Sequence, residues 1–423
     1  MFGHINDQQN TGATEAAKVR KMRKTGILTL YYKNYNFGGM LQAYALPRAC
    51  HYLGVDTEQI TYDYRQKDVS CIKAGRAQRI KAAFQKGVLT GSGYIISKTW
   101  NKFRSKTVAK KEREQLAARR KQFDKFQELV SHSGKVYTYA DFANGMDQYS
   151  AIICGGDQIW NDWGASNEEN AIKSFTLQFP TTAKKVSYGA STHTGLSETF
   201  LKVLLAGLVD FDFLAVREKT VAKFLADKLQ REVVPVLDPA LLLTAEQWDE
   251  VSVPPQIDQK FVTCYFLGKG AKKYRAVERL VKATQTISVT FPCMEADGYT
   301  LQDETFGDIR DFTSGPAEFV GLIKSAECVI TDSFHAIVFS LIYHKPFYVF
   351  ERNTQVGGGT MNSRIHDFLE EFGLQDRLVT PEQLEKKKTI EPIDYTYADK
   401  VLARRRKESY DYLKTALGIQ NEV

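Results

Sequence analysis

The segment CVITDSFHAIVFSLIYHKPFYVF, residues 328–350, places polar side chains between two strongly apolar runs. CVIT is typical of a buried strand, and a helical apolar period begins at Phe334, so we expect Asp332 or Ser333 to cap the helix and His335 to lie in its first turn. Unpaired N–H groups at a helix N-terminus favour phosphate or carboxylate. Two interpretations are open: a helix cap beside a packed histidine, or an anion site in which His335 does acid–base chemistry.

Two arginines occupy comparable positions at predicted strand ends and helix starts. Arg217, in FLAVREKT, follows one buried strand and precedes a helix, while Arg364, in VGGGTMNSRIHDF, begins a helix after a three-glycine loop. The planar guanidinium suits bidentate capture of carboxylate or phosphate. A surface or helix-capping role is the alternative interpretation for either arginine taken alone.

Two glycine-bearing loops also follow predicted strands. NFGG contains Asn36 and Gly38, and CGGDQIWN contains Asp157 and Gln158. Glycine lets the backbone approach a ligand closely, so these four residues are candidate contacts for a substrate. Neither loop fits the dinucleotide-binding fingerprint or the P-loop, and each is a weak signal by itself.

The elements that must position these residues alternate between short apolar strands and amphipathic helices. This alternation covers residues 26–250 and begins again over 260–378, with a proline-containing linker at 251–259. Continuous apolar strands indicate parallel sheets covered on both faces, so we predict two Rossmann-like α/β domains. Ligands in such folds bind at the carboxyl ends of the strands, here in a central cleft. Residues 1–25 are expected to be a flexible leader, and 379–423 a loop and a terminal helix.

Length and composition agree with two domains. The chain has 423 residues, of which 43% are hydrophobic, and this exceeds what one core normally organises. The longest apolar runs have about eight residues, well short of the roughly 20 that cross a bilayer. Six cysteines show no metal-ligand spacing and read as reduced thiols. We therefore expect a soluble, cytoplasmic protein without a bound metal.

The positive charge is concentrated in one segment. Residues 73–125 contain 16 Lys and Arg but only three acidic residues, whereas the whole chain carries +7. A surface helix is expected at 109–130. The segment could contact an anionic membrane at its inner face, at about 1 kcal/mol per basic residue, or it could be a solvated insertion. No recognition motif accompanies the charge, so we predict no nucleic-acid binding.

Six segments together resemble a known family. They occur in one order between residues 26 and 378 and read GILTLYYKNYNFGGMLQAYAL, AIICGGDQIWN, KKVSYGAST, AVREKT, VLDPALLL and ITDSFHAIVFSLIYHKPFYVF. This ordered set resembles the polysaccharide pyruvyl transferase family. The resemblance implies a GT-B-like fold, phosphoenolpyruvate as the donor with no further cofactor, and a sugar of a glycan or lipid-linked oligosaccharide as the acceptor. The implied product is a cyclic pyruvate ketal.

The resemblance also implies roles for individual residues. His335 matches the key catalytic or donor-binding histidine, and Arg217 matches a position that contacts the donor's anionic groups. Some members carry an arginine two residues before the histidine, where this chain has Ser333, so Arg364 and Lys345 are the candidates for the remaining phosphate contact. Two rivals stay open: a GT-B glycosyltransferase with a nucleotide-sugar donor, and a non-catalytic glycan-binding protein of the same fold.

Overall fold

The computed structural model describes residues 24–64, 106–161, 168–268, 270–292, 305–352, 355–356, 359–360 and 362–419. Almost all of the predicted leader, 1–25, and the part of the basic segment before residue 106 lie outside these ranges.

The first half of the chain forms a parallel sheet in the order β2-β1-β3-β4. Its strands are β1 (Thr25–Leu28), β2 (Thr57–Gln59), β3 (Ala151–Cys154) and β4 (Lys184–Ser187). A parallel pair, β5 (Ala215–Val216) and β6 (Val234–Pro235), continues beyond β4, with bridges from Val186 of β4 to Phe213 and from Ala190 to Val216 of β5. The helices are α2 (Phe37–Tyr52), α6 (Tyr139–Phe142), α7 (Glu168–Phe175), α8 (Glu198–Leu208) and α9 (Lys219–Leu229).

The second half forms a parallel sheet in the order β11-β10-β7-β8-β9. Its strands are β7 (Phe261–Tyr265), β8 (Ile287–Thr290), β9 (Ile309–Arg310), β10 (Cys328–Thr331) and β11 (Phe347–Val349). The helices are α11 (Ala271–Thr284), α12 (Pro316–Ser325), α13 (Phe334–Ile342), α14 (Ser363–Phe372) and α15 (Pro381–Lys386). A short hairpin, β12 (Gln355–Val356) and β13 (Gly359–Thr360), precedes α14. Both parallel sheets were predicted from the continuous apolar character of their strand segments.

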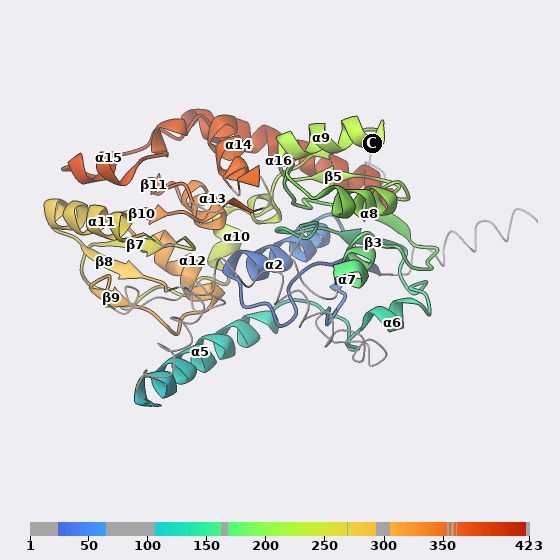
Figure 1. Cartoon of the computed structure of the whole chain (residues 1–423), viewed down its shortest axis with the longest axis horizontal. Coiled ribbons are helices and arrows are strands. Elements are labelled where there is room, and N and C mark those ends of the chain that lie inside the picture. The colour runs from blue at the N-terminus through green and yellow to red at the C-terminus, as the bar shows by residue number, and fades with distance from the viewer. Residues whose placement is uncertain are drawn as a thin grey trace, which may run out of the picture.

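Both halves are therefore Rossmann-like α/β domains, and the GT-B-like fold class is confirmed. In Figure 1 the second domain, in yellow and orange, lies beside the first, in green, with α2 between them. A 3-10 turn, η2 (Pro239–Leu242), and α10 (Ala245–Asp249) lead from the first domain toward the second. A second 3-10 turn, η5 (Gln375–Arg377), leads from α14 to the tail.

The terminal helix, α16 (Thr396–Leu417), crosses back from the second domain to the first (Figure 1). The hydroxyl of Tyr412 donates to the carbonyl of Ser187 at 2.8 Å, and the backbone N–H of Leu237 donates to Oγ of Ser409 at 3.0 Å. The predicted tail is thus a packed part of the first domain and not a separate appendage.

Helix α2 begins at Phe37, so the predicted NFGG loop is in fact a helix start. Asn36 caps it by accepting a hydrogen bond from the N–H of Gly39 at 3.0 Å. Phe37 stacks on Phe319 of α12 with ring centroids 4.7 Å apart, which fixes this end of α2 against the second domain. The side-chain cap is what moved the helix start three residues earlier than the apolar period suggested.

Helix α5 (Lys106–Gln127) carries the described part of the basic segment. Phe123 and Phe126 on its inner face are fully buried in a core shared with α2 and the second domain. Arg119 donates to the carbonyls of Pro292 and Asp311, both at 2.6 Å. The predicted surface helix is therefore exposed on one side only, and its other side joins the two domains. Within the described ranges, no helix combines the length and apolarity that a bilayer span requires.

Candidate functional site

The two domains meet at the carboxylate of Asp238, which follows β6. Nη1 of Arg217, which follows β5, donates to Oδ2 of Asp238 at 2.9 Å. Nε2 of His335, at the start of α13 in the other domain, lies 3.4 Å from the same oxygen. All three side chains are buried. The predicted arginine and histidine thus come together at one oxygen, because both follow strands whose carboxyl ends point toward the domain boundary.

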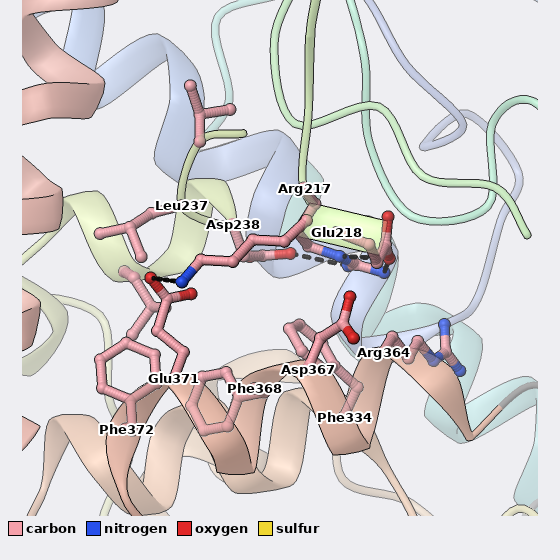
Figure 2. Close-up of a pocket in the computed structure, with 13 residues that line it drawn as sticks. Arg217, Glu218, Leu237, Asp238, Phe334, Arg364, Asp367, Phe368, Glu371 and Phe372 are labelled. Atoms are coloured by element: carbon pink, nitrogen blue, oxygen red, sulfur yellow. Dashed lines mark hydrogen bonds and ion pairs between the residues drawn. The ribbon is translucent and has the colours of Figure 1, made fainter. Parts of the chain in front are cut away.

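Arg217 is surrounded by acidic groups (Figure 2). Besides Asp238, its guanidinium donates to Oε1 of Glu218 at 2.8 and 3.0 Å. It also donates to Oδ1 of Asp157 at 2.8 Å and to Oγ of Ser191 at 2.9 Å. The ring of Phe334 covers the guanidinium, with its centroid 4.2 Å from Cζ of Arg217. These bonds use nearly all of its N–H groups. The side chain is at the predicted place, but the protein's own carboxylates already hold it.

Asp157 joins the two predicted arginines across the domain boundary. Its Oδ1 accepts from Nη2 of Arg217 and from Nη1 of Arg364, each at 2.8 Å, and its own N–H donates to Oε1 of Gln42 at 3.0 Å. Burial alone would raise the pKa of Asp157, but the charges of Arg364 and Arg217 outweigh it and lower the pKa. Asp157 is therefore ionised and ties α14 of the second domain to the first.

The charges of this cluster shift the pKa values of both partners at the shared oxygen. Burial would raise the pKa of Asp238, yet His335 and Arg217 lower it to about 2. Burial would lower the pKa of Arg217, yet Glu218, Asp157 and Asp238 raise it. Asp238 is thus a carboxylate at neutral pH and lies opposite the imidazole of His335.

Gly38 is in contact with the other side of the same imidazole. A Cβ atom at position 38 would overlap ring atoms of His335, with Nδ1 the nearest of them. Of the predicted contact residues, Gly38 therefore lies at His335 itself, in the first turn of α2, and Asn36 is the N-cap of the same helix. His335 has Asp238 at Nε2 and the α2 backbone at Nδ1, and only 5% of its surface is exposed.

Of the two predicted N-caps, Asp332 and Ser333, the choice of Asp332 is wrong. The N-cap of α13 is Ser333, whose side chain makes no capping hydrogen bond. The carboxylate of Asp332 accepts instead from the N–H groups of Leu267 and Gly268 at 2.7 and 2.9 Å and from Nζ of Lys273 at 2.9 Å. Asp332 turns toward the neighbouring strand end because β7 lies beside β10 in the sheet, and it fixes the loop after β7.

The two remaining candidates are Lys345 and Gln158. Lys345 follows the last turn of α13, at the opposite end of that helix from His335, and burial lowers its pKa. It does not join the cluster, so the structure argues against the predicted phosphate contact. Gln158 follows Asp157 with a left-handed φ of 53°, which turns the chain after β3.

A narrow pocket opens beside Arg217 and Asp238, between the first domain and α14 (Figure 2). It encloses about 30 Å³, which is enough for about one or two water molecules. Its lining comprises Arg217, Glu218, Lys219, Val236, Leu237, Asp238, Leu241, Phe334, Arg364, Asp367, Phe368, Glu371 and Phe372. At this place, the predicted central cleft is therefore only a narrow space between the domains.

Sequence reasoning missed several residues of the cluster. Asp238, Glu218 and Phe334 were not candidates, although Asp238 lies in the VLDPALLL segment. The parallel pairing of β5 and β6 places Asp238 beside Arg217, and the rule that parallel strands end at one edge would have pointed to it. Among the described residues, no group of three or more His, Cys, Asp or Glu side chains could hold a metal ion.

Comparison with known families identifies the family of this chain. The model of the family described as polysaccharide pyruvyl transferase matches residues 36–354, a range that includes the α2 start, Asp157, Arg217, Asp238 and His335. The chain belongs to the polysaccharide pyruvyl transferase family. No curated protein matches this pyruvyl transferase family member.

Solved structures similar to this pyruvyl transferase family member have low sequence identity. TarM from S. aureus is 10% identical, covers 94% of this chain and 100% of its own, and has a TM-score of 0.47. UDP-GlcNAc 2-epimerase from Neisseria meningitidis is 11% identical, with 92% and 100% covered and a TM-score of 0.42. The glycosyltransferase SnogD from Streptomyces nogalater is 10% identical, with 94% and 99% covered and a TM-score of 0.40.

Proposed function

We propose that this protein transfers pyruvate from phosphoenolpyruvate to a sugar of a glycan or lipid-linked oligosaccharide, forms a cyclic ketal and releases phosphate. The observation that carries the proposal is the position of His335, which lies at the domain boundary beside Asp238 and inside the range that the family model matches. No cofactor beyond the co-substrate is needed, because the enol phosphate is itself activated for protonation at carbon.

In the proposed reaction His335 acts as general acid and then as general base. Its imidazolium donates a proton to the methylene carbon of phosphoenolpyruvate, which leaves an oxocarbenium-like centre at C2. A sugar hydroxyl attacks C2 and gives its proton to the neutral imidazole. The C–O bond to phosphate then breaks as the imidazolium gives a proton to the leaving phosphate oxygen. A second hydroxyl of the same sugar attacks C2, closes the ketal and returns its proton to the imidazole. Proton transfer of this kind is typically worth about 10²–10⁴-fold in rate.

Asp238 supports this role by its position. A buried carboxylate lies 3.4 Å from Nε2, and α2 lies against Nδ1, so the ring is held between Asp238 and Gly38. Nδ1, which faces Gly38 and the first turn of α2, is then the nitrogen that exchanges protons with the substrate. Arg217 holds Asp238 in place and balances its charge, so we assign Arg217 a positioning role.

Substrate entry requires the domains to separate. The pocket beside Arg217 encloses only about 30 Å³, and the α2 backbone covers Nδ1 of His335. Two-domain enzymes commonly bind substrate in an open form and assemble the catalytic groups on closure. In the open form, Asn36 and Gly38 of α2 and Asp157 and Gln158 after β3 would face the acceptor sugar.

Incubation with phosphoenolpyruvate and galactosyl, mannosyl or glucosyl acceptors tests the proposal. We expect acceptor-dependent phosphate release and a ketal carbon in the NMR spectrum of the product. Titration with uridine and guanosine nucleotides runs in parallel. Nucleotide binding with no phosphate release from phosphoenolpyruvate would overturn this proposal and favour a GT-B glycosyltransferase with a nucleotide-sugar donor. Binding of a glycan with neither activity would favour the non-catalytic protein.

A further inference from the structure

The positive charge that would bind a phosphorylated donor does not come from Arg217. Three carboxylates, those of Glu218, Asp157 and Asp238, surround its guanidinium within 3.0 Å and use nearly all of its N–H groups. An anion placed there would meet three like charges, which costs free energy in a buried site. Another pair of cations must supply the attraction.

Two buried arginines of the second domain have donors to spare. Arg352, which follows β11, is 9% exposed, and its Nη2 has no partner among the described residues. Arg364, in the first turn of α14, is 7% exposed, and its Nε lacks a partner within the same part of the chain. A buried guanidinium N–H without an acceptor costs free energy, so an anion that accepted from both side chains would stabilise them.

The fold ties these two arginines together. Asn362 accepts from the N–H of Arg352 and donates to its carbonyl, each at 3.0 Å, so the strand end of β11 lies against the start of α14. Nε of Arg352 donates to the carbonyl of Asp332 at 2.8 Å, directly before α13. The arginines therefore lie at the N-terminal ends of two helices, where unpaired N–H groups also favour an anion.

The charges of the two arginines repel each other, although Arg364 pairs with Asp157 and Arg352 lies 3.6 Å from the carboxylate of Asp332. Burial, together with the charges of Arg352 and Arg217, lowers the pKa of Arg364 to about 10 against the opposing effect of Asp157. An anion between Arg352 and Arg364 would relieve this repulsion. Figure 2 shows Arg364 at the start of the helix that carries Asp367 and Phe368, at the rim of the pocket beside Arg217.

We infer that Arg352 and Arg364 form the binding site for the phosphate group of the substrate, next to the start of α13. A tetrahedral phosphate offers enough oxygens to accept from both guanidinium groups and from helix N–H groups at once. Naming that substrate as phosphoenolpyruvate rests on the proposed function. The two arginines supply the charge that Ser333, a neutral residue at the N-cap of α13, does not.

Calorimetric titration of the full chain and of the variants Arg352→Gln and Arg364→Gln tests the inference. The probes are phosphoenolpyruvate, inorganic phosphate and pyruvate, and the last has the carboxylate without the phosphate. Each variant should weaken binding of the two phosphorylated probes by about 10- to 100-fold, the range for a charge-assisted hydrogen bond, and leave pyruvate binding unchanged.

The matched control is Arg377→Gln. Arg377 is 8% exposed and also has a buried Nε without a partner among the described residues, but it pairs with Asp376 on the far side of the sheet's last strand. We expect it to bind all three probes as the parent chain does. Circular dichroism of each variant shows that the fold is intact, and Arg352→Lys and Arg364→Lys, which retain the charge, should restore part of the affinity.

The outcomes separate the two proposals. Equal affinity of parent and glutamine variants for phosphoenolpyruvate overturns the phosphate site, even if the enzyme turns the donor over. A loss of pyruvate binding as large as the loss of phosphate binding also overturns it, since the site would then hold the carboxylate. Arginine-dependent binding of inorganic phosphate without turnover of phosphoenolpyruvate supports the site and overturns the proposed function.

Discussion

Gly38 of α2 and His335 of α13 are in contact across the domain boundary, and there is no room for a side chain at position 38. This contact joins the first domain to the proposed proton-transfer group. It makes the orientation of the imidazole depend on how the two domains close.

Gly38→Ala should therefore impair turnover without unfolding the protein. The added methyl group must displace the imidazole or α2, and a small misplacement of a catalytic group costs about 100-fold in rate. We expect kcat to fall by about that factor with little change in KM. The matched control is Gly39→Ala, where the nearest atoms to a Cβ lie at 3.4 Å. Similar kinetics for both variants would remove Gly38 from the positioning of His335.

His335→Ala should remove the proton-transfer group. We expect phosphate release to fall by about 10²–10⁴-fold, while the circular dichroism spectrum is retained. His344→Ala, at the other end of the same helix, is the control, because its side chain is half-exposed and contacts Asp399. Near-normal turnover of His335→Ala would exclude the proposed acid–base role.

Asp238→Asn should make the free energy of unfolding vary less with pH in the acid range. The folded pKa of Asp238 is about 2, below its ordinary value of 3.8, so its charge stabilises the folded state above about pH 4. This contribution is lost as pH falls toward 2. Urea unfolding should show Asp238→Asn to be less stable by about 2 kcal/mol at pH 7, with the difference shrinking by pH 3. Exposed Asp227→Asn is the control, and a pH-independent difference would contradict the assignment.

Asp332→Ala and Ser333→Ala should differ sharply in stability. Removing the carboxylate of Asp332 leaves Lys273 buried without its partner, which costs about 3–5 kcal/mol. Ser333 makes no capping hydrogen bond through its side chain, so its removal should cost less than about 0.5 kcal/mol. Denaturant unfolding measures both. A larger loss of stability in Ser333→Ala than in Asp332→Ala would show that the side chain of Ser333 caps α13.

Binding to anionic vesicles tests the basic segment. We expect residues 73–125 to give peripheral binding that weakens at high salt. Lys121 and Lys125 are exposed on α5, and Lys121→Gln with Lys125→Gln should weaken binding by about 1 kcal/mol per charge. Lys223→Gln with Lys228→Gln, exposed on α9, is the control. If binding to the vesicles is absent or does not change with salt concentration, the basic segment is a solvated insertion.

The sequence by itself determined the order of strands and helices and the two-domain α/β class. Apolar period and turn residues are local signals, so the strands before Arg217 and His335 could be placed, and both residues could be assigned to carboxyl edges of sheets. The residue types of the six segments also pointed to the family that the match over 36–354 confirmed.

Only the tertiary structure decided the partners of these side chains. Asp157 and Arg364 are 207 positions apart and meet because two domains close on each other. Asp332 was expected to cap its own helix, but a neighbouring strand end supplied better donors. Local patterns specify which element a residue occupies, whereas the pairing of buried charges depends on which strand ends the fold places side by side.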